Sequence, residues 1–306
     1  MAENSSEKFK IIGCENNNSE EIVRKNVTYW QDAWRRLKQN KVAVISLALL
    51  IVIILLAIIG PMLRPFTTND VNDSIKNIGS NSTHWLGTDD LGRDLWVRLW
   101  VGTRSSIIIG IVGAAIELVI GALYGGISGY FGGIVDDIMM RIIEILNSIP
   151  YLILVLIVII VLNSTGIIPL IIGMTLTGWV GMARIVRGQV LSIKEQEYVL
   201  AAKTLGAGST RIIMKHLLPN VIGVMIVDVT FAVPNYIFAE AFLSYIGLGV
   251  KPPSTSLGAL CSSGQSNLMF YPYQLFWPSL IICLIMLTFN LLGDGLSEAL
   301  DPKQRQ

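Results

Sequence analysis

The feature that most constrains this chain is a set of long apolar segments that contain no charged residue. Residues 42–59 carry no Asp, Glu, Lys or Arg, and residues 145–183 carry none over a stretch about twice as long. A helix needs roughly 20 apolar residues to cross the hydrocarbon core of a bilayer. Because a helix satisfies its own backbone hydrogen bonds, it suits such segments in lipid. We therefore predict an all-α integral membrane protein.

The overall composition agrees with this prediction. Only 15% of the residues are charged and 52% are apolar, whereas soluble domains carry about 25% charged residues. The net charge of +1 gives no electrostatic reason to expect a nucleic-acid partner. The three cysteines show no CxxC or metal-ligand spacing, so we expect free thiols and no metal site.

Six spans are expected in a transmembrane domain that covers residues 42–296. They are residues 42–59, about 105–130, two spans within 145–183, about 221–246 and 276–293. The sequence NSTG at residues 163–166, with Pro169 just beyond it, separates the third span from the fourth. A tail of residues 1–41 precedes the domain and a tail of residues 297–306 follows it.

Lysine and arginine predict the orientation of these spans. The first tail, the connections after the second and fourth spans and the last tail hold 17 of the 23 Lys and Arg residues, and the opposite loops hold six. Positive residues favour the cytoplasmic side, so both tails are expected there. Residues 1–41 contain no apolar core before a small-residue cleavage site, which indicates an uncleaved first span.

The first tail is expected to end in a helix that lies at the membrane surface. Trp30, Ala33, Trp34 and Leu37 share one helical face beside basic residues, a pattern typical of helices in the headgroup layer.

A charged, Ala- and Gly-rich insert, EYVLAAKTLGAGSTRIIMKHLLPN, separates the fourth and fifth spans at residues 197–220. It predicts a short helix, a sharp turn at Gly206 and a second helix capped by Ser209 that ends before Pro219. Its small residues would let a partner surface approach closely. The alternative is a folded loop without a partner.

This insert resembles the EAA loop in the membrane subunits of bacterial ABC importers. Ala201, Ala202, Gly206 and the pair Leu218-Pro219 stand at the positions of that pattern. The acidic residue lies three positions earlier than usual, at Glu197 instead of at Leu200, and His216 replaces an isoleucine. Both departures are typical of the peptide and nickel branch of these importers.

Other segments are similar to markers of the same branch. They include HWLGTDDLGRDLWVRLWVGTRSSIIIG from His84, EAFLSYIGLGV from Glu240 and FNLLGDGLSEALDPK from Phe289. The segment TYWQDAWRRLKQNK resembles the oligopeptide-permease C subunits in particular. The stretch PPSTSLGAL departs from the branch, which usually has Pro and Trp where Thr255 and Leu257 stand.

The resemblance implies a six-span bundle of the type I ABC importer permease kind, with a cytoplasmic coupling loop at about residues 188–219. This loop would dock on an ATPase through Glu197, Ala201, Ala202, Gly206, His216 and Pro219. The implied partners are a second homologous permease, two cytoplasmic ATPase subunits that hold ATP and Mg, and an extracytoplasmic binding protein. Oligopeptides are the implied substrate, and the bacterial cell membrane is the implied location.

Common catalytic signatures are missing from the sequence. It contains no GxxxxGK phosphate loop, no GxSxG and no HExxH, which argues against common nucleotidase, serine-hydrolase and metalloprotease chemistry. We therefore expect a transport subunit with no catalytic residue, no metal site and no cofactor of its own. A membrane enzyme is the disfavoured alternative.

Two further alternatives concern transport. A permease for dipeptides or a nickel chelate fits the same branch, and a self-contained proton-coupled transporter could use Glu117 and Asp228. Ionisable residues within spans usually face a bundle interior or water. Asp228 is expected either to line the pathway or to pair with Arg184 or Arg187, and Glu240 is expected to have a structural partner.

Two glycine patterns complete the sequence-based expectations. Glycine recurs every fourth residue at Gly121, Gly125, Gly129 and Gly133, which favours close helix packing. The segment GTDDLGRD, beginning at Gly87, combines turn residues with balancing arginines. It predicts an ordered outer loop more strongly than an acidic cation site.

Overall fold

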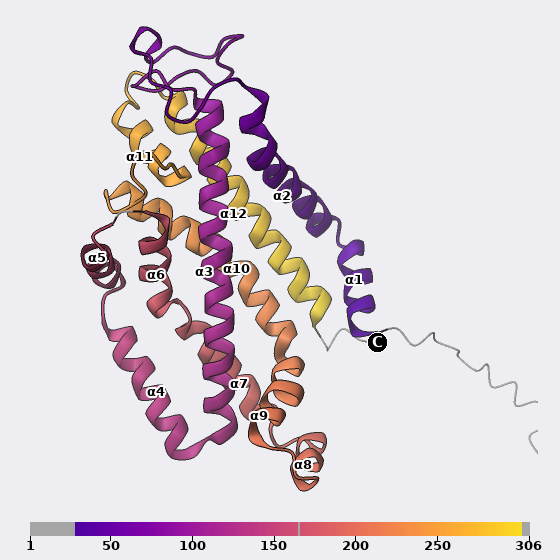
Figure 1. Cartoon of the computed structure of the whole chain (residues 1–306). Helices are drawn as coiled ribbons and strands as arrows, with labels where there is room; N and C mark the ends of the chain where they lie inside the picture. The colour runs from indigo at the N-terminus through magenta and orange to yellow at the C-terminus, as the bar shows by residue number, and fades with distance from the viewer. Residues whose placement is uncertain (1–27, 165, 302–306) are drawn as a thin grey trace, which may run out of the picture.

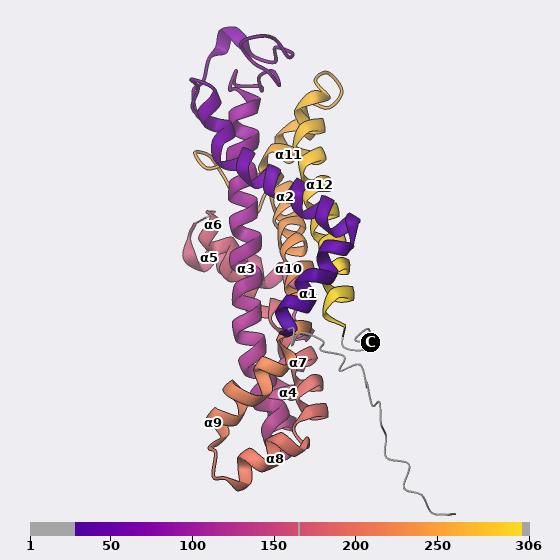
Figure 2. The same ribbon diagram turned by 90° about the vertical axis from the view of Figure 1, so that its right-hand side faces the viewer.

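The computed structural model describes residues 28–164 and 166–301, and the regular structure in these ranges is helical. The α-helices are α1 (Tyr29–Gln39), α2 (Lys41–Ile59), α3 (Leu95–Phe131), α4 (Gly133–Ser148), α5 (Tyr151–Leu162), α6 (Ile167–Gly178), α7 (Val180–Ile193), α8 (Glu197–Thr204), α9 (Ser209–Ile212), α10 (Leu218–Tyr245), α11 (Leu257–Ser266) and α12 (Tyr273–Leu300). They form an elongated bundle with the α8–α9 pair at one end and the loop between α2 and α3 at the other (Figure 1 and Figure 2).

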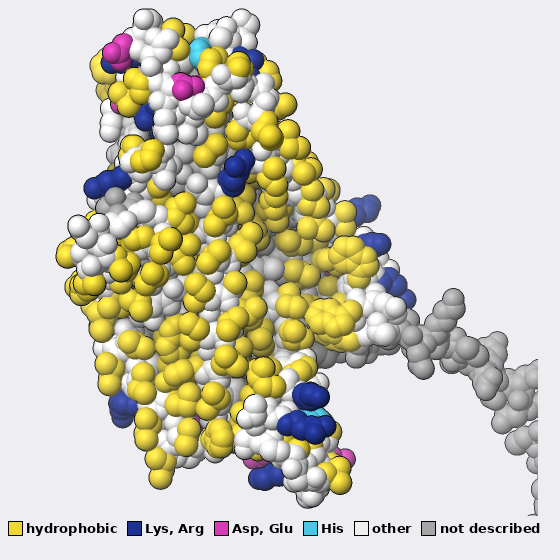
Figure 3. All heavy atoms as spheres, viewed as in Figure 1, with side chains coloured by type: hydrophobic (Ala, Val, Ile, Leu, Met, Phe, Trp, Pro, Cys, Tyr) yellow, Lys and Arg dark blue, Asp and Glu magenta, His cyan; other side chains and the backbone are white. Residues whose placement is uncertain are grey.

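Five helical stretches are long and apolar enough to cross a membrane. They are Lys41–Leu63, Leu95–Phe131, Ile167–Ile193, Ser209–Tyr245 and Tyr273–Leu300. The pair formed by α4 and α5 becomes a sixth span if it is counted as one, although it is bent by 82°. The predicted helical membrane fold is confirmed, with five candidate spans, or six if the bent pair is counted as one. In Figure 3, hydrophobic side chains cover most of the middle of the visible face, and charged groups lie at its two ends and along its right-hand edge.

Several predicted span boundaries were wrong. The third span was expected to begin near residue 145, but α4 already begins at Gly133 and the break falls at Ile149 and Pro150. Proline lacks a backbone N–H and pushes the residue before it out of the helical region. The expected break at residues 163–166 is confirmed, because Asn163 adopts a left-handed conformation that ends α5.

Helix α3 begins ten residues before the expected start of the second span. The Asp94 carboxylate accepts a hydrogen bond from the backbone N–H of Val97 at 2.9 Å and so caps the first turn of α3. The helix has 37 residues, which corresponds to about 55 Å at 1.5 Å per residue. It is therefore longer than the roughly 30 Å hydrocarbon core and must extend beyond the bilayer.

The glycines of α3 allow it to pack closely against α7. A Cβ atom at Gly121 would lie 2.6 Å from the side chain of Met182, and one at Gly125 would overlap the carbonyl oxygen of Ala183. Gly129 is similarly crowded by α7. The close-packing prediction is confirmed for these three residues. It was wrong for Gly133, which is the first residue of α4 and has a φ of +51° and open space beside it.

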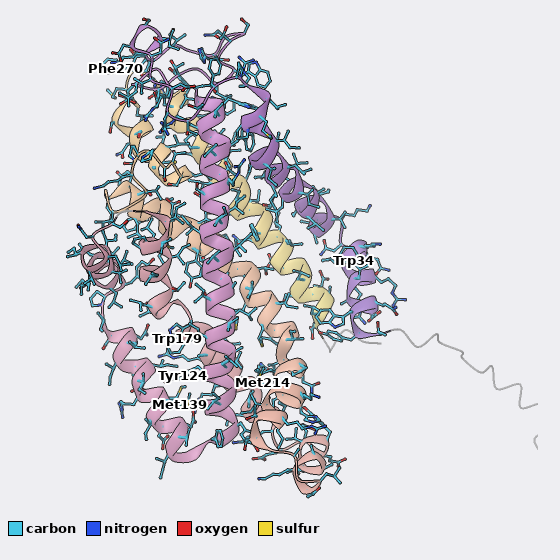
Figure 4. All side chains as sticks on the ribbon, viewed as in Figure 1. Trp34, Tyr124, Met139, Trp179, Met214 and Phe270 are labelled. Carbon is cyan, nitrogen blue, oxygen red and sulfur yellow. The ribbon has the colours of Figure 1, made fainter. Side chains whose placement is uncertain are left out.

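The first helix rests on the last one. Ala33 and Leu37 of α1 are buried, and Leu37 shares a small apolar cluster with Ala299 of α12. Trp30 and Trp34 stay half exposed on the same helix, and Figure 4 labels Trp34. The amphipathic helix expected before the first span is therefore present, with only part of its apolar face packed against protein.

Helix α4 packs against α3 and α7 through an aromatic cluster. The Tyr124 hydroxyl donates to the carbonyl oxygen of Met139 at 2.8 Å, and the rings of Tyr124 and Trp179 lie 4.7 Å apart. Figure 4 shows these three residues between α4 and the α3–α7 pair. The Arg187 guanidinium also reaches Asp136 of α4 at 2.5 Å. These contacts hold α4, the first helix of the bent α4–α5 pair, against α3 and α7.

Candidate functional site

A polar hollow of about 300 Å³ lies among α3, α5, α6 and α10. We call it the polar notch and define it by its polar lining residues, Glu117, Tyr151, Thr177, Asp228, Asn235 and Tyr236. On α10 the other lining residues lie 3, 4, 7, 8 and 11 positions after Asp228, so they share one helical face. Asp228 lies about 15 Å from the start of α10, at 1.5 Å per residue. The notch therefore lies around the middle of α10.

Tyr236 is the most enclosed polar residue of the notch. Its side chain is only 7% exposed, and its hydroxyl faces Glu117. Within the described part of the chain this hydroxyl has no hydrogen bond of ordinary geometry. A Cβ atom at Gly178 would overlap the hydroxyl, so this glycine gives the phenol its place in the notch.

The two carboxylates of the notch belong to Glu117 and Asp228. No Lys or Arg is among the described residues that line the notch. The alternative in which Asp228 pairs with Arg187 is not found, because Arg187 binds Asp136 instead. Among the described residues, no Lys or Arg lies within ion-pair distance of Glu117 or Asp228, and none lines the notch. Unpaired acids at this depth cannot face lipid without a large cost. The notch can accept hydrogen bonds or a positive charge.

Sequence reasoning identified Glu117 and Asp228 but missed Asn235 and Tyr236. The signal was available on α10, because Asn235 and Tyr236 follow Asp228 by seven and eight residues and therefore share its helical face. The sequence contains no comparable signal for the notch residues on α5 and α6. Tyr151 and Thr177 reach the site only through the packing of helices far apart in the sequence.

The α8–α9 helix pair forms a second candidate site at one end of the bundle. Helix α8 ends in a Schellman turn, in which the N–H of Ala207 bonds to the carbonyl of Ala202 and the N–H of Gly206 bonds to that of Lys203. Gly206 has a φ of +82°, a conformation that glycine adopts without a steric cost. The predicted turn at Gly206 is confirmed.

One face of the helix pair is anchored and the other is open. Val199, Ile212 and Leu217 are buried in a cluster with Val186 and Val190 of α7. On the open face, Leu205 is 88% exposed and Leu200 is 49% exposed. Partial burial raises the pKa of the Tyr198 phenol above its ordinary range. The pair is thus a rigid projection with an exposed apolar tip.

The six residues expected to dock on an ATPase all lie on or beside this projection. Glu197, Ala201, Gly206 and Pro219 are exposed, and Ala202 and His216 are partly buried. No catalytic or metal-binding role was expected of them.

The prediction for the second helix of the pair was wrong in two details. Ser209 is its first residue and not its cap, which is Gly208. The helix also does not end before Pro219, because it passes through a π-turn at Ile213–Leu217 and continues as α10. Pro219 follows the π-turn directly, in the first turn of α10. The α8–α9 pair is therefore joined to a membrane helix without a flexible link.

Glu240 has the structural partners that the sequence led us to expect. It is completely buried, and its carboxylate accepts hydrogen bonds from the hydroxyls of Ser106 at 2.9 Å, Ser244 at 2.7 Å and Ser256 at 2.6 Å. These residues belong to α3, α10 and the start of α11. Glu240 therefore joins three helices.

The loop between α2 and α3 is ordered, as predicted. Asp89 accepts from the Nε of Arg93 at 2.7 Å, and Asp94 bonds to the Nδ1 of His84 at 2.8 Å. Gly87 and Gly92 adopt positive φ angles of +83° and +71°. A Cβ atom at Gly92 would overlap the carbonyl oxygen of Asn72, so this turn requires glycine.

Comparisons with known proteins agree with this architecture. A family model described as the binding-protein-dependent transport system inner membrane component matches residues 118–306. A second, the N-terminal TM domain of oligopeptide transport permease C, matches residues 28–81.

Similar proteins cover almost the whole chain. The oligopeptide transport system permease protein OppC of Bacillus subtilis (strain 168) is 47% identical over 97% of this chain and 97% of its own length. The dipeptide transport system permease protein DppC of the same organism is 48% identical over 97% of this chain and 93% of its own length. An inward-facing structure of the MetNI methionine ABC transporter shares the fold, with a TM-score of 0.54 and 20% identity over 66% of this chain and 97% of that one.

Proposed function

Because this chain belongs to the family of binding-protein-dependent transport system inner membrane components, we propose that it is the peptide-conducting permease subunit of an ATP-driven importer. The observation that carries the proposal is the full-length similarity to both OppC and DppC of Bacillus subtilis. Oligopeptides are the proposed substrate because residues 28–81 match the N-terminal domain of oligopeptide transport permease C. Dipeptides and a nickel chelate are the rivals, since the OppC and DppC relatives are almost equally similar to this chain.

The polar notch supports a role in the pathway. Its acids and amide lie between helices that are apolar enough to span a membrane, and Asn235 is exposed there. A polar surface in the apolar belt is stable when it faces water or another protein chain. We propose that a second, homologous permease covers this side of the bundle, and that the notch lines the peptide pathway between the two subunits.

The α8–α9 pair supports coupling to an ATPase. Its exposed tip at Leu205 suits an apolar groove on a partner, and its continuous connection to α10 would carry a movement of the partner into the membrane. We propose that Glu197, Ala201, Ala202, Gly206, His216 and Pro219 form the docking surface. Two cytoplasmic ATPase subunits would bind ATP and Mg, so this chain needs neither catalytic residues nor a cofactor.

The proposal also fixes the arrangement of the chain in a bacterial cell membrane. Residues 1–41 and 297–306 are cytoplasmic tails, residues 42–296 form the transmembrane domain, and the coupling loop extends over about residues 188–219. Most of the first tail and the last five residues lie outside the described residues. The opposite end of the bundle, which includes α11 and the loop before α3, receives the extracytoplasmic binding protein.

A self-contained proton-coupled transporter is the second candidate. The unpaired carboxylates of Glu117 and Asp228 favour it, since such groups can carry protons. It differs from the first proposal in one testable respect, because it requires no ATPase.

Uptake of labelled substrates tests the substrate. Cells with and without the chain are given di-, tetra- and hexapeptides and a nickel chelate. Loss of uptake of the longer peptides in the deleted cells supports an oligopeptide permease. If only uptake of dipeptides or of the nickel chelate is lost, that compound is the substrate instead. Unchanged uptake of every compound would contradict the importer proposal.

Substitution of Gly206 tests the docking surface. A side chain at Gly206 meets open space, and the strain of its positive φ costs about 1 kcal/mol, so Gly206→Asp should fold and insert. We expect it to abolish peptide uptake, because the added side chain occupies the space where a partner would approach. Gly188→Ala is the control, since that site is also open but lies outside the docking surface. Normal uptake by Gly206→Asp would refute this docking surface.

A further inference from the structure

Helix α1 carries two tryptophans that the rest of the bundle covers only in part. Ala33 and Leu37 are buried, whereas Trp30 and Trp34 are each 51% exposed. The two tryptophans are four residues apart and therefore lie on one face of the helix. Tryptophan joins an apolar ring system to a polar N–H and is enriched where membrane meets water. The pair therefore forms an aromatic surface of the kind found in the headgroup layer.

Exposed lysines adjoin this aromatic surface. Lys38 follows Trp34 by four residues, and its ammonium lies 5.2 Å from the centre of the Trp34 ring. Lys41, the first residue of α2, is also exposed. In Figure 3, Lys and Arg side chains lie along the right-hand edge, where Figure 1 places α1 and the start of α2. We define the α1 surface by Trp30, Trp34, Lys38 and Lys41.

The acids nearest to α1 do not neutralise these lysines. Asp32 is paired with two arginines of its own helix at 2.9 and 3.0 Å. Glu298 of α12 reaches the helix at Asn40, whose amide donates to it at 3.0 Å, and Asp294 precedes Glu298 by one turn. Asn40 is two residues from Lys38, so the two point to different faces. Neither lysine has an ion pair among the described residues, and the α1 surface therefore carries positive charge.

Lipid is the occupant that this surface fits. Val42 and Ile45 of α2 come directly after α1 and are 52% and 67% exposed, on a helix long and apolar enough to span a membrane. The aromatic surface thus adjoins one that faces lipid. The proposed second permease covers the notch beside α5 and α6, and α1 lies on the opposite side of the bundle (Figure 1). The basic charge selects among lipids for those with anionic headgroups.

The first residue of α1 connects this surface to the helix that carries the α8–α9 pair. A Cβ atom at Gly223 of α10 would lie 2.8 Å from the Tyr29 hydroxyl, so Tyr29 rests on α10. The same hydroxyl donates to the carbonyl oxygen of Leu300 on α12 at 3.4 Å. Helix α10 continues from α9 through the π-turn. The position of α1 therefore bears on the end of α10 that joins the α8–α9 pair.

We propose that the α1 surface binds anionic phospholipids of the cytoplasmic leaflet and that this binding favours ATP-driven uptake. Lys38 and Lys41 contact the headgroups, and the two tryptophans insert beside them. The bound lipid holds α1 against α10 and α12. The leaflet and the energy source rest on the proposed function, whereas lipid binding is measured without transport.

The first test uses the complete transporter in nanodiscs of phosphatidylcholine that contain an equal fraction of brominated phosphatidylglycerol or brominated phosphatidylcholine. Bromine quenches the fluorescence of a tryptophan that it contacts. Subtracting the signal of the same protein with Trp30→Phe and Trp34→Phe isolates the two α1 tryptophans. The charge variants are Lys38→Gln and Lys41→Gln. Arg141→Gln is the matched control, because it removes an exposed charge on α4, on the other side of the bundle.

We expect phosphatidylglycerol to quench the α1 tryptophans of the wild type more strongly than phosphatidylcholine. Each lysine variant should lower this preference about fivefold, as for one basic residue at an anionic surface, and Arg141→Gln should leave it unchanged. High salt should lower the preference in the wild type. Equal quenching by the two lipids, or an unchanged preference in both lysine variants, would overturn the proposal. Absence of quenching by either lipid would show that another chain covers α1 and would overturn it as well.

The second test measures ATP-driven uptake of a labelled tetrapeptide in proteoliposomes as phosphatidylglycerol replaces phosphatidylcholine. Wild-type uptake should rise at least twofold, and uptake by the Lys38→Gln, Lys41→Gln double variant should rise less. Arg141→Gln should respond as the wild type does. Equal responses of the wild type and the double variant would overturn the effect on uptake. Absence of ATP-driven uptake in every lipid mixture would instead contradict the proposed function, since the fluorescence test of lipid binding does not depend on transport.

Discussion

Replacement of Glu240 should show how strongly one buried carboxylate holds the outer half of the bundle together. Its Oε1 accepts hydrogen bonds from Ser244 and Ser256, and its Oε2 accepts one from Ser106. The side chain is completely buried, and no ion pair involving it is present among the described residues. Its effect on stability therefore comes from hydroxyl donors on three elements.

The structure predicts different effects for alanine and glutamine at this position. Glu240→Ala leaves three buried hydroxyls without their acceptor, and each costs about 1–3 kcal/mol. Ser244 can bond back to its own helix, so we expect a total loss of about 3–5 kcal/mol. In Glu240→Gln the amide oxygen replaces Oε1. The amide nitrogen can donate to the Ser106 oxygen, which also accepts from the backbone N–H of Leu257 at 3.1 Å. We expect a loss of about 1 kcal/mol.

Thermal unfolding of the purified transporter measures this difference. A loss of 1 kcal/mol lowers the midpoint by about 2–4 °C in chains of this size class, so Glu240→Ala should lower it by about 10 °C and Glu240→Gln by about 3 °C. Glu195→Ala, at an exposed site, is the control and should change little. Equal midpoints for Glu240→Ala and the control would refute the assignment of Glu240 as a joint between helices.

Three further predictions concern other parts of the bundle. Gly125→Ala should destabilise the transporter by about 1–3 kcal/mol in thermal unfolding, because its Cβ atom would overlap the backbone of α7; an unchanged midpoint would contradict the close contact. Arg187→Met should cost about 2 kcal/mol, since it leaves the buried Asp136 carboxylate unpaired. Adding Asp136→Asn should restore most of that loss, and no restoration would count against the pair. Asp228→Asn should lower peptide uptake about tenfold, as for one lost charge-assisted hydrogen bond, while binding of the ATPase subunits stays intact; unaltered uptake would remove Asp228 from the pathway.

Much of the membrane architecture could be predicted from the sequence because it depends on local composition. The charge-free segments predicted membrane spans. Asn163 predicted the break between α5 and α6, and Gly206 predicted the turn after α8. Each of these signals acts within a few residues of where it is read. Helix ends were less accurate, since the cap at Asp94 and the break at Pro150 extend or divide helices in ways that hydropathy does not record.

The candidate sites were only partly predictable because they depend on distant contacts. The pairing of Asp136 with Arg187 joins residues 51 positions apart, and this pairing leaves Asp228 free to line the notch. Tyr236 occupies its place because Gly178 on another helix has no side chain. Pro219 suggested a helix end, but the π-turn before it lets the helix continue, and sequence alone does not reveal that adjustment.

The energy source of uptake tests the central claim most directly. The complete transporter is reconstituted in proteoliposomes with its binding protein, and uptake of a labelled tetrapeptide is measured with ATP supplied without a proton gradient, and then with a proton gradient without ATP. An ATP-coupled permease predicts uptake in the first condition and none in the second. Uptake driven by the proton gradient alone would contradict the role of the α8–α9 pair and would make Glu117 and Asp228 the coupling groups.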